Sequence, residues 1–402
     1  MRRERELIYL VAPSGHPNFG DEFIASAWLR ELARRRPRAR VVLDCHTPGV
    51  AAVLHHRVHP DLTVTDTLWR LAERAETPDD AAAVVADPGR FPELVSGVHL
   101  AAHADVVHVL GGGWINDHWP HHTKVVAAAA SVGRPQAVRA ATGQGLTPAT
   151  EVAADLAPWW ARFDRVDVRD TPSLDVLPAG VDAAVSGDDA WLYAADTVVR
   201  HGLGQGTADA RDRDFVLCAQ SDLLGVPVEQ LAQWLLDALR ALGATGPRLA
   251  VVECIPRGDA VVWDHMRRLD PHLCAGAHFV AFDELWTHGL PARPGQTWVT
   301  TRYHPHLIAA ARGARGIAVV AHEGPYYQVK HEAVGSSWPV VAVTGSSGTE
   351  VPAAGPGFTE GQLRERSELA RAVADRIYPV GRLADVVRNT FEALRDKLWA
   401  QG

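Results

Sequence analysis

Short apolar, β-branched runs alternate with amphipathic segments along almost the whole chain, and this alternation constrains the fold more than any other feature. The runs Leu7–Val11, Asp105–Leu110 and Arg248–Cys254 have the length and composition of buried strands. The segments Phe23–Leu32 and Val228–Leu242 show the spacing of amphipathic helices. Such alternation predicts an α/β fold, in which doubly wound parallel sheets carry helices on both faces.

A Gly-rich, polar segment divides this alternation into two series. The segment His201–Asp212 has the composition of a linker between domains. We therefore expect two Rossmann-like, doubly wound domains that face each other across a cleft, formed by residues 1–205 and 206–402. The second domain is expected to end in two helices, over Thr359–Ile377 and Leu383–Trp399.

The composition limits the classes of function that the chain can have. A net charge of -8 over 402 residues gives no electrostatic case for binding nucleic acid. No apolar window reaches the length of a membrane span and none resembles a signal peptide, so we expect no transmembrane segment and a cytoplasmic location. The four cysteines form no CxxC pair and the histidines show no recognised ligand spacing, so no metal is expected. The oligomeric state is left open.

Two loops in the first half follow predicted strands and are suited to ligand binding. The loop Pro13–Glu22 leads into a helix, whose N-terminus offers N–H groups to an anion. Asp21 in this loop could equally be a simple N-cap. The strand Asp105–Leu110 runs directly into Gly111–Gly113, which permits either a tight turn or a close approach of the backbone to a ligand.

The strongest functional signal in the second half follows the run Trp298–Thr301. Arg302 comes directly after this run, and His304 stands two residues later. Parallel sheets bind ligands at the carboxyl ends of their strands, where an Arg can fork onto a carboxylate or a phosphate. A His at the same edge can transfer protons near neutral pH. Lys330 supplies another cation on a later loop. The alternative to a ligand-binding role is that Arg302 and His304 are purely structural.

Several short blocks, taken in this order, resemble the polysaccharide pyruvyl transferase family. The blocks are Asn18–Glu22, Leu110–Gly113, Gly143–Gly145 with Pro148, Val168–Ser173, Thr301–His304, Gly316–Val320, and Tyr326–Tyr327 with Lys330. The resemblance implies two Rossmann-like domains of the GT-B glycosyltransferase type. It also implies transfer of pyruvate from phosphoenolpyruvate to hydroxyls of a saccharide or glycoconjugate acceptor, as a ketal, in the synthesis of a cell-surface polysaccharide or a specialised metabolite. No cofactor is implied beyond this co-substrate.

The resemblance further implies roles for individual residues. Arg302 and His304 are expected at the donor, together with Lys330 and Gln220. The acceptor is expected in the N-terminal half, at Asn18, Gly20, Gly112, Gly113, Asn116 and Arg169. Ketal formation requires an acid to protonate the enol carbon and a base to accept the proton of the hydroxyl group. We expect His304 to be the acid and Asp21 to complete the catalytic set with Arg302, while Asp117, His118 and Asp188 remain alternative bases.

One position departs from the family pattern. Family members usually carry an Arg at the end of the first strand of the second domain, where this chain has Gln220. An amide cannot replace the fork of an Arg on a phosphate, so another cation among Lys330, Arg257 and Arg169 could take its place. The other possibility is that this chain uses a different donor. Two further hypotheses therefore stay open: a glycosyltransferase that uses a nucleotide sugar, and a repurposed family member that binds a different anionic ligand.

Overall fold

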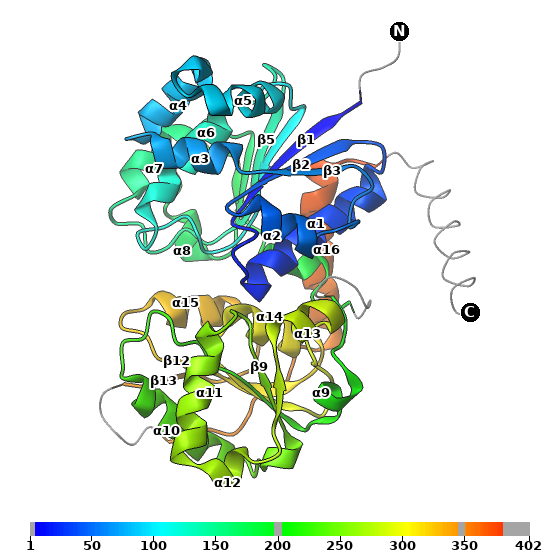
Figure 1. Ribbon diagram of the computed structural model, residues 1–402, viewed down its shortest axis with the longest axis vertical. Coiled ribbons are helices and arrows are strands. Elements are labelled where there is room, and N and C mark those ends of the chain that lie inside the picture. The colour runs from blue at the N-terminus through cyan, green and yellow to red at the C-terminus, as the bar shows by residue number, and fades with distance from the viewer. Residues whose placement is uncertain (1–4, 197–202, 345–349, 381–402) are drawn as a thin grey trace, which may run out of the picture.

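The structure is a computed structural model in which residues 5–196, 203–344 and 350–380 are described. Two parallel β-sheets, each flanked by helices, lie one above the other (Figure 1). This arrangement confirms the α/β class and the two doubly wound sheets expected from the sequence. The expected helix Leu383–Trp399 lies outside the described residues.

The first sheet has seven parallel strands in the order β3-β2-β1-β4-β5-β6-β7, so the strand order reverses between β1 and β4. Its strands are β1 Leu7–Ala12, β2 Arg40–Cys45, β3 Leu62–Thr65, β4 Val106–Val109, β5 Val138–Gln144, β6 Arg165–Val168 and β7 Ala183–Val185. The helices that connect them are α1 Phe19–Arg35, α2 Pro48–Leu54, α3 Thr67–Arg74, α4 Pro78–Ala86, α5 Val95–Ala101, α6 Thr123–Ser131, α7 Ala153–Trp160 and α8 Thr171–Leu174.

The second sheet has six parallel strands in the order β10-β9-β8-β11-β12-β13, with the reversal between β8 and β11. Its strands are β8 Phe215–Cys218, β9 Leu249–Val252, β10 His278–Val280, β11 Thr297–Thr300, β12 Arg315–Val320 and β13 Val340–Ala342. Its helices are α9 Ala208–Asp212, α10 Val228–Ala241, α11 Gly258–Leu269, α12 Pro271–Cys274, α13 Phe282–His288, α14 Tyr303–Ala311 and α15 Tyr326–Ala333. Helix α9 occupies the end of the segment expected to be a linker. In both sheets the reversal creates a crevice at the carboxyl ends of the strands.

The sequence of β1 and α1 shows how one such crevice is built. All six residues of β1 are buried, because helices cover both faces of the sheet. Helix α1 begins at Asn18, whose side-chain oxygen accepts a hydrogen bond from the backbone N–H of Gly20. Acidic residues stand in the first turn of α1 and Arg34 and Arg35 in the last, as the helix dipole favours. The first turn of α1 is thereby held at the carboxyl edge of β1.

The last described helix, α16 Glu360–Ile377, matches the expected helix Thr359–Ile377 but contacts the first half of the molecule. It packs against β5 and against η4, a short 3-10 helix over Asp189–Leu192, and in Figure 1 it lies beside α1. Just after it, the hydroxyl group of Tyr378 lies 3.1 Å from Nδ1 of His108, which is buried in β4. The chain therefore crosses between the two halves a second time.

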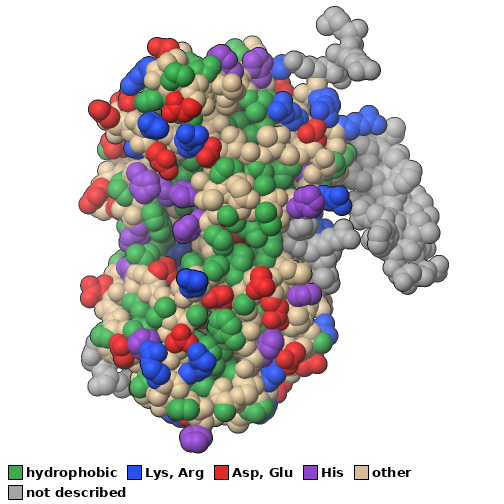
Figure 2. Space-filling view, in the orientation of Figure 1, with side chains coloured by type: hydrophobic (Ala, Val, Ile, Leu, Met, Phe, Trp, Pro, Cys, Tyr) green, Lys and Arg blue, Asp and Glu red, His purple; other side chains and the backbone are tan. Residues whose placement is uncertain are grey.

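Direct hydrogen bonds also join the two halves. The backbone N–H of Phe19 donates to the carbonyl of Cys254 at 2.9 Å, and the indole N–H of Trp286 donates to the carbonyl of Leu54 at 3.0 Å. Figure 2 shows histidine side chains gathered at one side of the waist between the halves. Within the described residues, no helix has both the length and the apolar character needed to cross a membrane.

Candidate active site

A cavity of about 360 Å³ lies between the carboxyl edges of the two sheets. Both halves of the molecule contribute to its wall. Of the eleven site residues expected from the sequence, nine line it: Asn18, Gly20, Asp21, Gly113, Arg169, Gln220, Arg302, His304 and Lys330. The structure thus brings together residues that are far apart in the sequence, such as Asn18 and Lys330.

His304 lies directly against the first turn of α1. A Cβ atom built on Gly20 would fall 1.8 Å from Nδ1 of His304, so only a glycine permits this contact. The neighbouring Asn18 donates a hydrogen bond from Nδ2 to Asp21 at 2.9 Å. The loop Asn18–Asp21 of the first half and the imidazole of the second half therefore form one surface of the cavity.

The pKa values of two carboxyl groups near His304 are shifted in opposite directions. Burial raises the pKa of Asp21 to about 6, although the nearby His304 lowers it. Burial would also raise the pKa of Asp188, but His304 and Arg169 hold it below its usual value. Oδ1 of Asp188 lies 3.5 Å from Nε2 of His304. Asp188 therefore stays ionised and can orient the imidazole, while Asp21 can gain or lose a proton near neutral pH.

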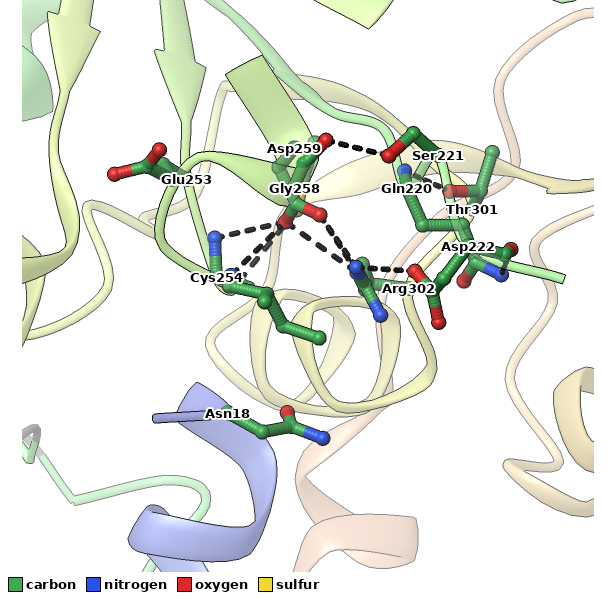
Figure 3. Close-up of polar contacts among 12 residues, drawn as sticks. Asn18, Gln220, Ser221, Asp222, Glu253, Cys254, Gly258, Asp259, Thr301 and Arg302 are labelled. Atoms are coloured by element: carbon green, nitrogen blue, oxygen red, sulfur yellow. Dashed lines mark hydrogen bonds and ion pairs between the residues drawn. The ribbon is translucent and has the colours of Figure 1, made fainter. Parts of the chain in front are cut away.

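The guanidinium group of Arg302 is held by two carboxylates of the second half (Figure 3). Nε lies 3.2 and 3.3 Å from the two oxygens of Asp259, and NH2 contacts Asp259 and also Asp222, the latter at 2.7 Å. Burial opposes the charge of Arg302, but Asp259 and Asp222 raise its pKa above the ordinary value. Only NH1 makes no hydrogen bond within the described part of the chain, so Arg302 has little capacity left for an anion.

Arg169 differs from Arg302, because it lines the cavity with a buried guanidinium group that carries only one ion pair among the described residues. Its side chain is only 1% exposed, and among the described residues NH1 and NH2 have no hydrogen-bond partner. Nε makes a hydrogen bond of 3.3 Å to Asp170, and the guanidinium carbon lies 4.8 Å from the centre of the Tyr303 ring. A buried guanidinium group with two unpaired terminal NH2 groups is suited to bind an oxyanion.

Lys330 and Gly113 complete the surroundings of Arg169. A Cβ atom built on Gly113 would fall 3.6 Å from NH1 of Arg169, 3.6 Å from Nζ of Lys330 and 3.0 Å from the hydroxyl oxygen of Tyr326. Burial lowers the pKa of Lys330. The absence of a side chain at Gly113 thus leaves a space bordered by two cationic groups and one hydroxyl, which we call the Arg169–Lys330 corner.

The sequence model of the polysaccharide pyruvyl transferase family matches residues 18–217, which include the loop at Asn18, the Gly111–Gly113 turn and Arg169. The chain belongs to the polysaccharide pyruvyl transferase family. The match confirms the family that the sequence blocks resemble, and with it the expectation that the chain is a transferase. No curated protein matches the chain significantly in sequence.

Solved structures resemble this family member at the level of the fold. UDP-GlcNAc 2-epimerase of Methanocaldococcus jannaschii, solved with UDP-GlcNAc and UDP, has 10% sequence identity and a TM-score of 0.50, over 92% of this chain and 99% of that one. The Anabaena protein HepE, solved with UDP, has 15% identity and a TM-score of 0.48, over 96% and 100% of the two chains. The epimerase supports the GT-B-like fold that was expected.

Two of the expected residues do not line the cavity of this pyruvyl transferase family member. Gly112 has a φ of +130°, and a Cβ atom there would fall 2.9 Å from the Trp114 ring. Asn116 donates to the carbonyl of Gly113 at 3.0 Å and accepts from the N–H of His118. Both residues shape the loop that holds Gly113, and their expected contact with an acceptor stays a prediction.

Gln220 lines the cavity at the position where the family usually has an Arg. Its amide nitrogen donates to the carbonyl of Asp222 at 3.1 Å, and Oε1 is buried with no partner within the described ranges. Gln220 thus offers no charge to a bound anion.

Several parts of the cavity were not predicted from the sequence. Asp259 and Asp222, which hold Arg302, stand 43 and 80 residues before it in the sequence. The only sequence feature that could have indicated them is their position shortly after predicted strands. The N-terminal wall is aromatic: the rings of Trp69 and Trp114 are 5.3 Å apart, and His122 packs against both.

The contact between Gly20 and His304 can be tested by stability. Gly20→Ala places a methyl group inside the imidazole, and we expect the displacement to lower the free energy of unfolding by about 1–3 kcal/mol. Gly49→Ala, in helix α2, is the matched control, because nothing lies within 4 Å of its Cβ position. We expect this control to be neutral or to stabilise by up to ~1 kcal/mol. Urea unfolding of both variants measures the difference, and equal stabilities would show that the ring does not rest on Gly20.

Proposed function

We propose that the protein transfers a pyruvyl group from phosphoenolpyruvate to hydroxyl groups of a sugar-containing acceptor and forms a ketal. Membership of the pyruvyl transferase family supports the class of reaction. The observation that carries the proposal is the buried guanidinium group of Arg169 beside Lys330, whose NH1 and NH2 have no hydrogen-bond partner in the described part of the chain. A doubly anionic phosphate or a carboxylate at this corner would satisfy N–H groups that are otherwise costly to bury.

The other side chains of the cavity supply the proton transfers that this reaction needs. His304 is the proposed acid that protonates the enol carbon, and Asp188 orients its ring. A hydroxyl group of the acceptor then attacks the cationic carbon, and Asp21 accepts its proton. Inorganic phosphate then leaves with the electron pair of the broken C–O bond. A second hydroxyl group attacks the resulting cationic carbon, its proton passes to the departing phosphate, and the ketal is complete. The carbon atoms of the enolpyruvyl group are all retained in the product.

The acceptor is proposed to bind on the N-terminal wall. Trp69 and Trp114 offer an aromatic surface there, which suits the apolar face of a sugar ring. The proposal includes the cytoplasmic location expected from the sequence, since phosphoenolpyruvate is an intracellular metabolite. A nucleotide-sugar transferase remains the second candidate, because solved structures of similar fold hold UDP.

Calorimetric titration of the purified chain separates these functions. We expect phosphoenolpyruvate to bind in preference to pyruvate and to UDP-GlcNAc, and to release inorganic phosphate when a sugar acceptor is supplied. In Gly113→Ala a methyl group occupies the Arg169–Lys330 corner, and we expect at least tenfold weaker binding, while Gly49→Ala binds normally. Tight binding of UDP-GlcNAc without any binding of phosphoenolpyruvate would replace the proposal by the nucleotide-sugar reaction.

A further inference from the structure

Two buried cysteines meet at the carboxyl edge of the second sheet. Cys218 is the last residue of β8, and Cys254 comes two residues after the neighbouring parallel strand β9. Their sulfur atoms are 3.6 Å apart, and both thiols are fully buried. A carboxylate oxygen of Asp259 joins them, so that the three ligand atoms lie within 4.8 Å of one another.

The spacing of these atoms matches tetrahedral coordination. Zinc–sulfur bonds of about 2.3 Å place two thiolates about 3.8 Å apart across a tetrahedral edge. The observed separation of 3.6 Å between Cys218 and Cys254 is close to that value. A zinc–oxygen bond of about 2.1 Å places a carboxylate oxygen about 3.6 Å from each sulfur, which fits the 4.8 Å limit for Asp259. The three side chains thus stand near chelating distance before any ion arrives.

The backbone already holds the carboxylate in place. Asp259 accepts hydrogen bonds from the N–H groups of Cys254 at 2.9 Å and Ile255 at 3.3 Å (Figure 3). These bonds fix its oxygen atoms beside the two thiols. An orienting bond on a carboxylate ligand is typical of protein metal sites.

The charges near the cluster favour a divalent cation over an empty, deprotonated pair. Two thiolates with Asp259 and Asp222 would carry four negative charges, against one positive charge on Arg302. A divalent cation leaves a net charge of minus one, and Asp222 is half exposed and can be solvated. Thiolate ligands select soft cations such as Zn²⁺ or Cd²⁺ over Mg²⁺ or Ca²⁺.

We propose that Cys218, Cys254 and Asp259 form a binding site for a thiophilic divalent cation of the zinc class. Cys254 is also one of the residues that line the cavity, so we expect water or a ligand from the cavity to complete the coordination of the ion. Coordination by Asp259 uses an oxygen lone pair that now binds Arg302. The ion therefore loosens Arg302 and makes its guanidinium group more available to the cavity.

Titration of the reduced, full-length chain with Cd²⁺ tests the site through the ultraviolet charge-transfer band of cadmium thiolates. We expect one Cd²⁺ per chain, displaced by Zn²⁺, with the band lost in Cys218→Ala and Cys254→Ala. Asp259→Asn should weaken binding about tenfold or more. Cys45→Ala and Cys274→Ala are matched controls, since both are buried free cysteines outside the cluster, and they should keep the band.

The wild-type titration decides the proposal even if a variant fails to fold. A wild-type protein with no stoichiometric band overturns the site. A band that survives Cys218→Ala but disappears with Cys45→Ala or Cys274→Ala overturns it as well. A band with the expected dependence on Cys218 and Cys254 supports it, whatever the donor and acceptor of the enzyme prove to be.

Discussion

Replacing Arg169 by Gln is expected to lower kcat/KM for phosphoenolpyruvate by roughly 10³-fold. The guanidinium group is buried at the cavity, and its two terminal nitrogens have no hydrogen-bond partner within the described residues, so an anionic donor is the group that they can satisfy. Gln retains hydrogen-bonding capacity but removes the charge and the fork. Steady-state release of inorganic phosphate measures the effect, with calorimetry to separate donor binding from chemistry.

Two comparisons make this prediction specific. Arg162→Gln removes an Arg that stacks on Trp159 outside the cavity, and we expect normal turnover. Arg302→Gln should instead destabilise the fold by about 3–5 kcal/mol, because it leaves Asp259 buried without its counter-charge. If the Arg169→Gln enzyme were fully active and the Arg302→Gln enzyme were folded but inactive, the anion of the donor would be assigned to Arg302 and not to Arg169.

Asp21→Asn is expected to reduce kcat by roughly 10³-fold and to change the pH profile. Burial raises the pKa of Asp21 to about 6, and a base must be deprotonated to accept a proton from the acceptor. The wild-type rate should therefore fall about tenfold per pH unit below pH 6, and the residual rate of the variant should lack this limb. Initial rates between pH 4.5 and 8.5 test this. An acidic limb that persists in Asp21→Asn would assign the base to another residue.

Although Asp21→Asn should lower activity, it should raise the stability of the folded protein at alkaline pH. A carboxyl group whose pKa is raised by folding favours the folded state while it is protonated, and this contribution is lost as the pH rises through about 6. At pH 8 Asp21 is ionised, and its buried charge destabilises the folded state. Asn carries no charge, so we expect Asp21→Asn to unfold at higher urea concentration at pH 8, by about 1–2 kcal/mol, with little difference at pH 4. The exposed Asp175→Asn is the control and should change neither.

The fold could be predicted because its determinants are local. The apolar run at Leu7–Val11 and the cap at Asn18 specify a strand and a helix without reference to distant residues. In each sheet the parallel strands end at one edge, and the cavity lies between these two edges, so Asp21 lines it from the first sheet and Arg302 from the second. The expected roles of these residues remain predictions, because shared location does not establish chemistry.

The pairing of charges could not be predicted, because it depends on which side chains meet across the sheet edge. Nothing near Arg302 in the sequence indicates that Asp259 holds it, and nothing near Arg169 indicates that its NH1 and NH2 have no hydrogen-bond partner among the described residues. Cys218 and Cys254 are 36 residues apart and form no recognised motif, yet parallel neighbouring strands bring their sulfur atoms into contact. The predicted absence of a metal rested on sequence spacing, which does not reveal such a cluster.

The return of α16 to the first sheet determines how the two halves can move. A single linker would let them separate in any direction, whereas two covalent connections leave mainly a rotation about the line that joins them. Such a hinge changes the distance between Arg169 and Lys330, which come from opposite halves, more than any distance within one sheet. We expect an anion bound by both residues to draw the two halves together, and small-angle scattering with and without phosphoenolpyruvate would detect this closure.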